Sequence, residues 1–481
     1  MIADCRYGHI CGPMIRGGKG RWQTSDHLEA LRRQGFWTMA LFSLACLAPL
    51  FTLVYMVSAY HIDAPRGEQW YLARYIELLY KGQFQYRFLF LQDEGEKPVF
   101  PTIVLLCLAR LTHWNIYYEM LTSIMLAFAT WIILTVKLIS TFKECGIRNC
   151  KWIAFVLSVI LFSLAQWENW LWGIRISVYL NILCVVVGLI LLTSRPVRPL
   201  HVMGAIILAI IATFSFSNGM VFWVIGLIII VLRKDYESRL VSAVGWSLAA
   251  AACLVIFFYD FRLPITAVPA ARIPHMPQKL CVFFLGYLGS PLLSWEMAKT
   301  LRPFAPYVGT AGLLAVIVAS WLLLRLLHVD FHKLVFVLGL AVYAAGSAAM
   351  TAIGRVNGGN PLIPRYTTTS SLLWIAVLSL LFMLWRLAAP RETRKPFTAI
   401  RVGAASGLVV IIFAFASNSF MARRGFYTFY NNELPREKEL FVLKNDQLLR
   451  GLFRDTQEIR RLIPFLKANR LCVFRSGGAS H

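Results

Sequence analysis

The charged side chains that can do chemistry are concentrated in residues 60–115, where the chain first leaves a long apolar segment. Only 15% of all residues are charged, yet this stretch contains Asp63, Glu68, Glu96 and Lys97. A carboxylate within about 3 Å of a hydroxyl can act as a general base, and lysine and arginine bind phosphate groups. This stretch is therefore the first candidate for a functional site, and the rest of the chain must supply the elements that hold it.

The composition predicts what those elements are. Of the 481 residues, 58% are hydrophobic, and the mean hydropathy is +0.62, whereas soluble domains contain about 45–50% apolar residues. The excess occurs in runs of roughly 17–22 residues, the length of helix that crosses the hydrocarbon core of a bilayer. The composition therefore predicts an all-α polytopic membrane protein, because a transmembrane barrel would require an alternating pattern that these runs do not have.

Basic residues between the apolar runs predict the orientation of the chain. Lysine and arginine collect in the cytoplasmic loops of membrane proteins, so the basic leader of residues 1–35 is predicted to be cytoplasmic. The transmembrane domain then covers residues 36–420 with about eleven spans, within a range of about 10 to 13, and the small polar tail of residues 421–481 lies outside. An amphipathic helix near residues 437–462 and a short strand over 471–474 are predicted within that tail. The predicted spans are residues 36–58, 116–136, 152–165, 178–192, two within 200–232, 240–259, 307–327, 334–351, 372–385 and 402–420.

Short helices at the membrane surface are predicted beside these spans. The first covers residues 68–81, where Glu77 and Lys81 are spaced to form an ion pair on one face. The second covers residues 98–111, which are apolar but too few to cross a bilayer. Residues 280–293 are short for the same reason, and treating them as re-entrant or interfacial keeps the later basic loops in the cytoplasm.

The predicted topology places five polar segments on the external face. External loops carried by a rigid helical scaffold are where binding and catalytic sites are commonly built. We therefore expect these segments to meet at one site. They are residues 60–115, 166–177 with the motif QWENWLWGIRIS, 215–219 with SFSNG, the proline-rich 260–279, and 354–366 with GRVNGGNPLIPRY.

Part of the first segment resembles a known superfamily. The sequences GEQWYLARYIELLYKGQF and EGEKPVFPTIVLL are similar to the first external loop of GT-C glycosyltransferases, with the closest similarity to the aminoarabinose and protein-mannosyl transferases. These multi-spanning enzymes transfer a sugar from a polyprenyl-phosphate-linked donor. The matching residues are Glu68, Tyr71, Arg74, Gly82 and the run Glu96-Lys97-Pro98.

The resemblance implies a catalytic base in this loop. In GT-C enzymes the catalytic aspartate usually begins an acidic pair, but this chain has Gly67 at the matching position. The role then passes to Asp63, four residues earlier, or to Glu68. If neither carboxylate takes it, the protein has a GT-C-like fold with altered or lost activity.

The resemblance also implies how a substrate is held. Lys97, Arg355 and Arg365 would bind the lipid phosphate, where negative charge develops as the sugar departs. Glu96 is expected to contact substrate as well, and Tyr366 and Trp170 would stack on the sugar or line the lipid entrance. Each of these residues also has a structural interpretation, such as anchoring to lipid headgroups. Glu168 and Arg175 are expected to pair with each other.

Other functions stay open alongside a glycosyltransferase. They are an O-antigen or polysaccharide polymerase or ligase, a transporter or flippase of lipid-linked glycans, and a scaffold without activity. The expected partners are membrane lipids and a lipid-linked sugar, in the inner membrane of a bacterium with the N-terminus in the cytoplasm. The net charge of +24 does not indicate nucleic-acid binding, because the basic residues lie in short loops. No cofactor is firmly implied, no histidine has the spacing of a metal ligand, and the use of a divalent metal and the oligomeric state stay open.

Overall fold

The computed structural model describes residues 20–92, 95–233, 236, 238–263, 267–297, 299–389 and 395–475, without the side chains of 20–36, 270 and 271. Two compact units make up the chain, residues 1–48 and 49–481. The second contains everything discussed below except the N-terminal part of α1 (Gly20–Tyr60). Every regular element in the described ranges is helical, and their only β-type pairing is an isolated bridge between Val197 and Tyr236.

Nine helical segments in the described part of the chain are long and apolar enough to cross a membrane. Each overlaps one predicted span, which confirms a polytopic helical membrane protein, although Lys395–Val442 continues into the predicted tail. The segments are Trp37–Tyr60, Ile116–Glu144, Ile153–Trp170, Gly173–Thr193, Arg239–Phe258, Arg302–Leu326, Phe331–Arg355, Pro364–Ala388 and Lys395–Val442.

The two spans predicted within residues 200–232 form shorter helices. They are α8 (Pro199–Thr213) and α9 (Met220–Leu232), of 15 and 13 residues, whereas a helix perpendicular to a bilayer needs about 20 residues to cross it. A turn at Ser217–Gly219 separates them, as the SNG motif predicts. The segment expected to be re-entrant or interfacial is also short, forming the 13-residue α11 (Pro277–Gly289).

Helix α14 (Thr367–Ala388) is the most enclosed element of the bundle. Almost all its residues are buried, as expected for a helix that is apolar around its whole circumference. It packs against α12 (Ala305–Trp321), α13 (Phe331–Arg355) and α15 (Lys395–Met421). This packing fixes the position of its first turn and of the residues just before it, which belong to the 354–366 segment.

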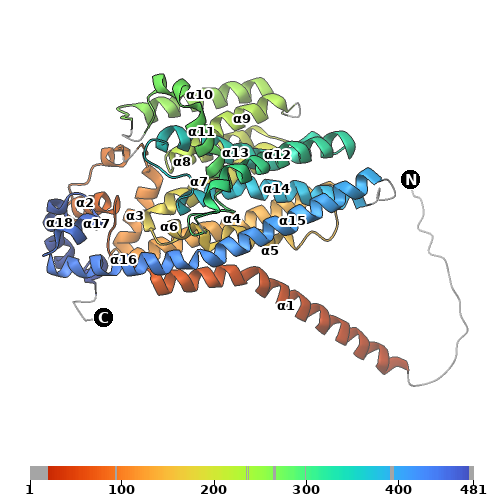
Figure 1. The fold of residues 1–481 in the computed structure, drawn as a ribbon, viewed down its shortest axis with the longest axis horizontal. Helices are drawn as coiled ribbons and strands as arrows, with labels where there is room; N and C mark the ends of the chain where they lie inside the picture. Colours follow the sequence, from red (N-terminus) through yellow and green to blue (C-terminus); the bar gives the residue numbers. More distant parts are fainter. Residues whose placement is uncertain are drawn as a thin grey trace, which may run out of the picture. The chain divides into compact units, whose positions relative to one another are not determined.

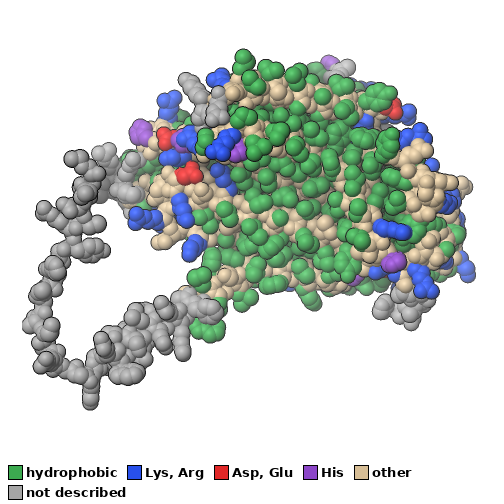
Figure 2. Space-filling view, turned by 180° about the vertical axis from the view of Figure 1, so that it is seen from behind, with side chains coloured by type: hydrophobic (Ala, Val, Ile, Leu, Met, Phe, Trp, Pro, Cys, Tyr) green, Lys and Arg blue, Asp and Glu red, His purple; other side chains and the backbone are tan. Residues whose placement is uncertain are grey.

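The outer surface agrees with a membrane environment. Figure 2 shows hydrophobic side chains forming a broad band across one face, with lysine and arginine gathered toward both sides of it. Large apolar residues such as Leu248, Ile317 and Phe413 are exposed. An exposed apolar area of this kind is unusual in a soluble monomer but is the natural surface of a helix bundle in lipid.

Both helices predicted in the first loop are present. They are α2 (Gln69–Tyr80) and α3 (Val99–Thr112). The predicted ion pair also forms, with 2.7 Å between Lys81 Nζ and Glu77 Oε1.

The predicted structure of the tail was wrong. A single helix near 437–462 is replaced by three, α16 (Arg423–Val442), α17 (Asp446–Leu452) and α18 (Thr456–Ala468), and the expected strand is a 3₁₀ turn, Cys472–Phe474. The breaks occur because the Asn445 and Asp455 side chains accept hydrogen bonds from the first turns of α17 and α18, which begins a new helix at each position. The apolar Leu471–Phe474 run is buried against other helices rather than paired with a strand.

The tail packs on the first loop. Figure 1 shows α17 and α18 beside α2, and Arg461 Nη1 of α18 lies 2.8 Å from Glu77 Oε2 of α2. Apolar residues of the tail, including Leu449 and Leu462, share one buried cluster with Trp70 and Ile76 of α2. The first loop is therefore held between the helix bundle and the tail.

Candidate functional site

A cavity of about 330 Å³ lies where the five predicted external segments meet. Each segment contributes lining residues, so the structure brings all five together. Apolar side chains form much of the wall. The polar lining residues are Glu68, Glu96, Asn169, Arg175, Ser177, Ser217, Asn218, Tyr287, Thr351, Arg355, Arg365, Tyr366 and Thr369.

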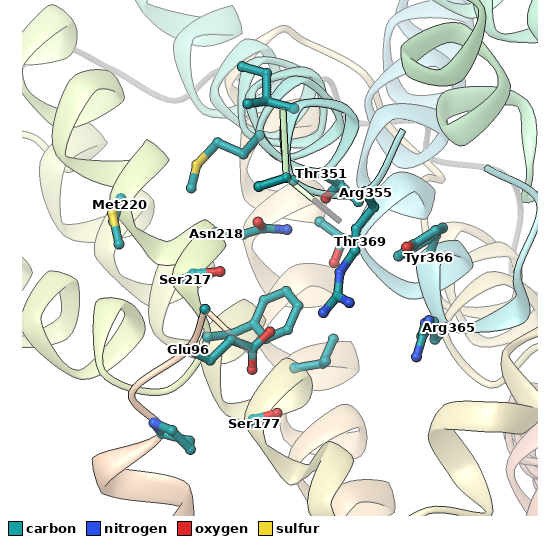
Figure 3. Close-up of a pocket in the computed structure, with 18 of the residues that line it drawn as sticks. Glu96, Ser177, Ser217, Asn218, Met220, Thr351, Arg355, Arg365, Tyr366 and Thr369 are labelled. Atoms are coloured by element: carbon teal, nitrogen blue, oxygen red, sulfur yellow. The ribbon is translucent and has the colours of Figure 1, made fainter. Parts of the chain in front are cut away.

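Five of the eight residues proposed from sequence line this cavity, namely Glu68, Glu96, Arg355, Arg365 and Tyr366. In Figure 3 the guanidinium of Arg355 and the carboxylate of Glu96 extend into the same space, and Asn218 faces it from another side. Arg355 ends α13, and Arg365 and Tyr366 lie in the 3₁₀ turn just before α14. The packing of these two long helices therefore sets the spacing of the two arginines.

Glu68 enters the cavity from the start of α2. Its Oε2 atom lies 3.9 Å from Arg175 Nη2, and the Arg175 guanidinium stacks 4.2 Å from the Trp172 ring centroid. The sequence predicted Glu68 at the site but did not predict that Arg175 is its partner. The predicted pair of Glu168 with Arg175 was wrong, because Glu168 Oε1 instead lies 3.7 Å from Arg365 Nη1.

Gly67 occupies the position where the resemblance to GT-C enzymes leads us to expect an aspartate, and its backbone conformation requires glycine. Its φ of +55° is in the left-handed region, which L side chains adopt at a cost of about 1–2 kcal/mol. A Cβ atom here would be 2.9 Å from Trp172 Cζ2, and the Gly67 N–H donates to the Leu452 carbonyl of the tail at 2.7 Å. The turn that presents Glu68 therefore depends on glycine.

Replacing Gly67 by aspartate is expected to lower stability rather than restore a catalytic group. Backbone strain and the overlap with Trp172 together give a loss of about 2 kcal/mol or more. Thermal unfolding of the purified protein measures the change, with Gly82→Asp as control. Gly82 has a similar φ of +67°, but no atom lies within 4 Å of the position that a Cβ would take, so the control isolates the backbone strain. An equal effect at both positions would contradict the role of the Trp172 contact.

Asn169 presents a buried acceptor at the cavity wall. Its amide nitrogen donates to the Arg365 carbonyl at 2.9 Å and to Thr368 Oγ1 at 2.7 Å. Its Oδ1 atom is buried and has no hydrogen-bond partner among the residues that the structure describes. Buried polar atoms are normally paired, so this oxygen is a candidate contact for a bound ligand or water. The alternation of tryptophans with polar residues in the QWENW motif is the signal that could have identified it.

Lys97 does not line the cavity, although its neighbours Glu96 and Pro98 do. Its Nζ atom donates to the Tyr259 carbonyl at 2.6 Å, just beyond the C-terminal end of α10 (Arg239–Phe258). Burial lowers the pKa of the Lys97 ammonium. In this position Lys97 joins the first loop to α10 and thereby fixes Glu96.

Asp63 and Trp170 also lie away from the cavity. The Asp63 carboxylate accepts from the Ile116 N–H at 2.9 Å and from Arg475 Nη2 at 2.5 Å. Burial raises the pKa of Asp63, and Arg475 opposes that shift. Trp170 is fully buried and stacks on Tyr179, with 4.5 Å between the ring centroids. Both residues hold the scaffold together in this structure.

Comparisons with known proteins do not identify the site. No protein-family model matches the chain, and no curated protein matches it. Within the described ranges, no group of three or more histidine, cysteine, aspartate or glutamate side chains is arranged to hold a metal ion. The chemistry of the cavity is therefore the main indication of function.

Proposed function

We propose that this protein is a membrane glycosyltransferase that moves a sugar from a polyprenyl-phosphate-linked donor to an acceptor on the external face. The observation that carries the proposal is one cavity that combines arginines and carboxylates with an apolar, exposed mouth. The first loop's similarity to GT-C enzymes supports the same function. Residues of the cavity are available to bind the phosphate, to contact the lipid chain and to accept the proton.

The arginines supply the phosphate site. Arg355 and Arg365 come from different helix ends and line the same cavity, and each guanidinium is able to make two parallel hydrogen bonds to a phosphate. Arg175 adds a third cation. When the sugar leaves, the electron pair of the broken bond stays on the phosphate oxygen, and fixed cations stabilise that developing charge.

The apolar wall supports a substrate with a lipid chain. Phe258, Leu263 and Ile353 line the cavity, and they are 50%, 68% and 40% exposed. The cavity wall is therefore continuous with the apolar outer surface, which faces lipid in a membrane protein. A polyprenyl chain can lie along this wall while its phosphate contacts the arginines.

Glu68 is the proposed general base. In an inverting transfer, the acceptor hydroxyl oxygen bonds to the anomeric carbon as the bond to the donor phosphate breaks, and the hydroxyl proton passes to a carboxylate. Glu68 lines the cavity and is only loosely paired, 3.9 Å from Arg175. A polymerase or ligase would use the same steps, whereas a flippase of lipid-linked glycans would need only the binding site.

Replacing Arg365 by alanine is expected to weaken binding of undecaprenyl phosphate by roughly 10- to 100-fold, because hydrogen bonds to a charged group contribute about 1.5–3 kcal/mol. Binding is measured by native mass spectrometry on the full chain in nanodiscs. Undecaprenol, which has the same lipid chain but no phosphate, is the comparison ligand. Arg272→Ala is the control, because Arg272 is exposed on the proline-rich segment and does not line the cavity. Equal losses in both variants would point to headgroup anchoring, and no preference for the phosphate over undecaprenol would overturn the phosphate site.

A further inference from the structure

A second cavity, of about 250 Å³, lies in the same part of the bundle. We call it the indole pocket, because two tryptophans are among its lining residues. Its polar groups are one carboxylate, one amide and one guanidinium. The residues that define it are Trp167, Trp295, Arg66, Glu168 and Asn360.

The indole pocket and the first cavity share two walls. In one wall, Glu168 lines the indole pocket and the next residue, Asn169, lines the first cavity. In the other, Pro364 lines the indole pocket and Arg365 lines the first cavity. The ion pair between Glu168 and Arg365, at 3.7 Å, joins these walls. Groups bound in the two cavities would therefore lie on opposite sides of one ion pair.

The two indoles are held in place before any ligand binds. Trp167 Nε1 donates to Glu296 Oε1 at 3.2 Å. Helix α16 presses against this ring so closely that a Cβ on Gly425 would be 2.2 Å from the same nitrogen. Trp295 carries the Arg302 guanidinium 3.9 Å from its ring centroid, and its backbone N–H donates to the Leu362 carbonyl at 3.3 Å. A pocket with fixed aromatic walls loses little entropy when it binds a ring.

The charges of the indole pocket favour a neutral ligand. Arg66 is paired with Glu433 at 3.8 Å, and Glu168 is paired with Arg365, so neither charge requires a counterion from a ligand. One hydrogen-bonding group is left over, because Arg66 Nη1 is buried without a partner among the described residues. Aromatic faces together with a few hydrogen-bonding groups suit a molecule that is apolar on one face and hydroxylated at its edge.

We propose that the indole pocket binds a sugar ring. A tryptophan stacks on the apolar face of the pyranose, and Glu168, Asn360 and Arg66 bond its hydroxyls. The inference that a sugar binds here depends only on the residues of the indole pocket. Its assignment as the acceptor site rests on the proposed function. A sugar in this pocket would lie beside the ion pair between Glu168 and Arg365, with its hydroxyl next to the cavity proposed for the donor.

The test uses methyl glycosides of common hexoses and the full chain in nanodiscs free of sugar detergents. Saturation-transfer NMR is expected to show transfer to at least one methyl glycoside, with affinity about tenfold lower in Trp295→Ala and largely retained in Trp295→Phe. Trp321→Ala is the control, because Trp321 is similarly exposed, at 59% against 42% for Trp295, and lies outside the pocket. Asn360→Ala provides a second variant if Trp295→Ala does not fold.

Two results would overturn the sugar site. One is the absence of transfer to every methyl glycoside in the wild-type protein, and the other is an equal loss in the pocket variants and in Trp321→Ala. Undecaprenyl phosphate binding is measured on the same samples and is expected to be unchanged in Trp295→Ala. If the glycosides bind but undecaprenyl phosphate does not, the result supports sugar binding by the indole pocket and contradicts the proposed donor site.

Discussion

Replacing Glu68 by glutamine is expected to reduce sugar transfer by about 10²–10⁴-fold, the usual contribution of a positioned general base. Glutamine keeps the size and most hydrogen bonds of the side chain but cannot accept the proton. Binding of undecaprenyl phosphate should change little, because the proposed phosphate contacts come from the arginines. Glycolipid or surface-glycan composition in cells that express the variant, measured by mass spectrometry, reports transfer.

The matched control is Glu96→Gln, because Glu96 lines the same cavity but is not assigned the proton transfer. A loss confined to Glu68→Gln supports the assignment. Unchanged glycans with the folded Glu68 variant present would remove Glu68 as the base, and a larger loss in the Glu96 variant would transfer the role to Glu96. Loss of lipid binding in Glu68→Gln would instead show that this residue mainly holds the site.

Replacing Asp63 by alanine is expected to destabilise the protein by about 2–4 kcal/mol, near the range for breaking a buried ion pair. Two interactions are lost together, the pair with Arg475 and the hydrogen bond from the Ile116 N–H. The Asp63 side chain is only 14% exposed. Water would therefore do little to replace the lost partner of the Ile116 N–H and the Arg475 guanidinium. Chemical denaturation or thermal unfolding in detergent measures the loss, together with protease sensitivity of the tail.

Asp446→Ala is a suitable control for Asp63→Ala. Asp446 also pairs with an arginine, at 2.7 Å from Arg460 Nη2, but its side chain is 56% exposed, and exposed pairs contribute about 0–1 kcal/mol. A loss of activity in Asp63→Ala without loss of stability would contradict the structural role and return Asp63 to the catalytic candidates.

The apolar runs predicted the bundle well, because the length and hydropathy of a span are local properties of the sequence. All nine long segments found among the described residues overlap predicted spans. The charge of the connecting loops also led to the right grouping of polar segments, since all five contribute to one cavity. Lys97, by contrast, was assigned by its motif, but its side chain turns toward the Tyr259 carbonyl.

The ion pairs were not predictable, because they depend on contacts between distant parts of the chain. Asp63 and Arg475 are 412 residues apart, and neither has a local feature that identifies its partner. Glu168 lies seven residues before Arg175, which suggested a local pair, but the 3₁₀ turn at Gly173–Arg175 directs Arg175 toward Glu68 instead. The helix breaks in the tail, in contrast, had visible signals in the capping residues Asn445 and Asp455.

The proposed function requires that the first cavity hold a lipid-linked phosphate between its arginines. A cryo-EM structure of the full chain in nanodiscs with added undecaprenyl phosphate tests it most directly. We expect density for the phosphate in contact with Arg355 and Arg365, with the polyprenyl chain following Phe258 and Leu263 to the outer surface. A cavity without phosphate density at saturating lipid, or phosphate bound only at the surface, would contradict it.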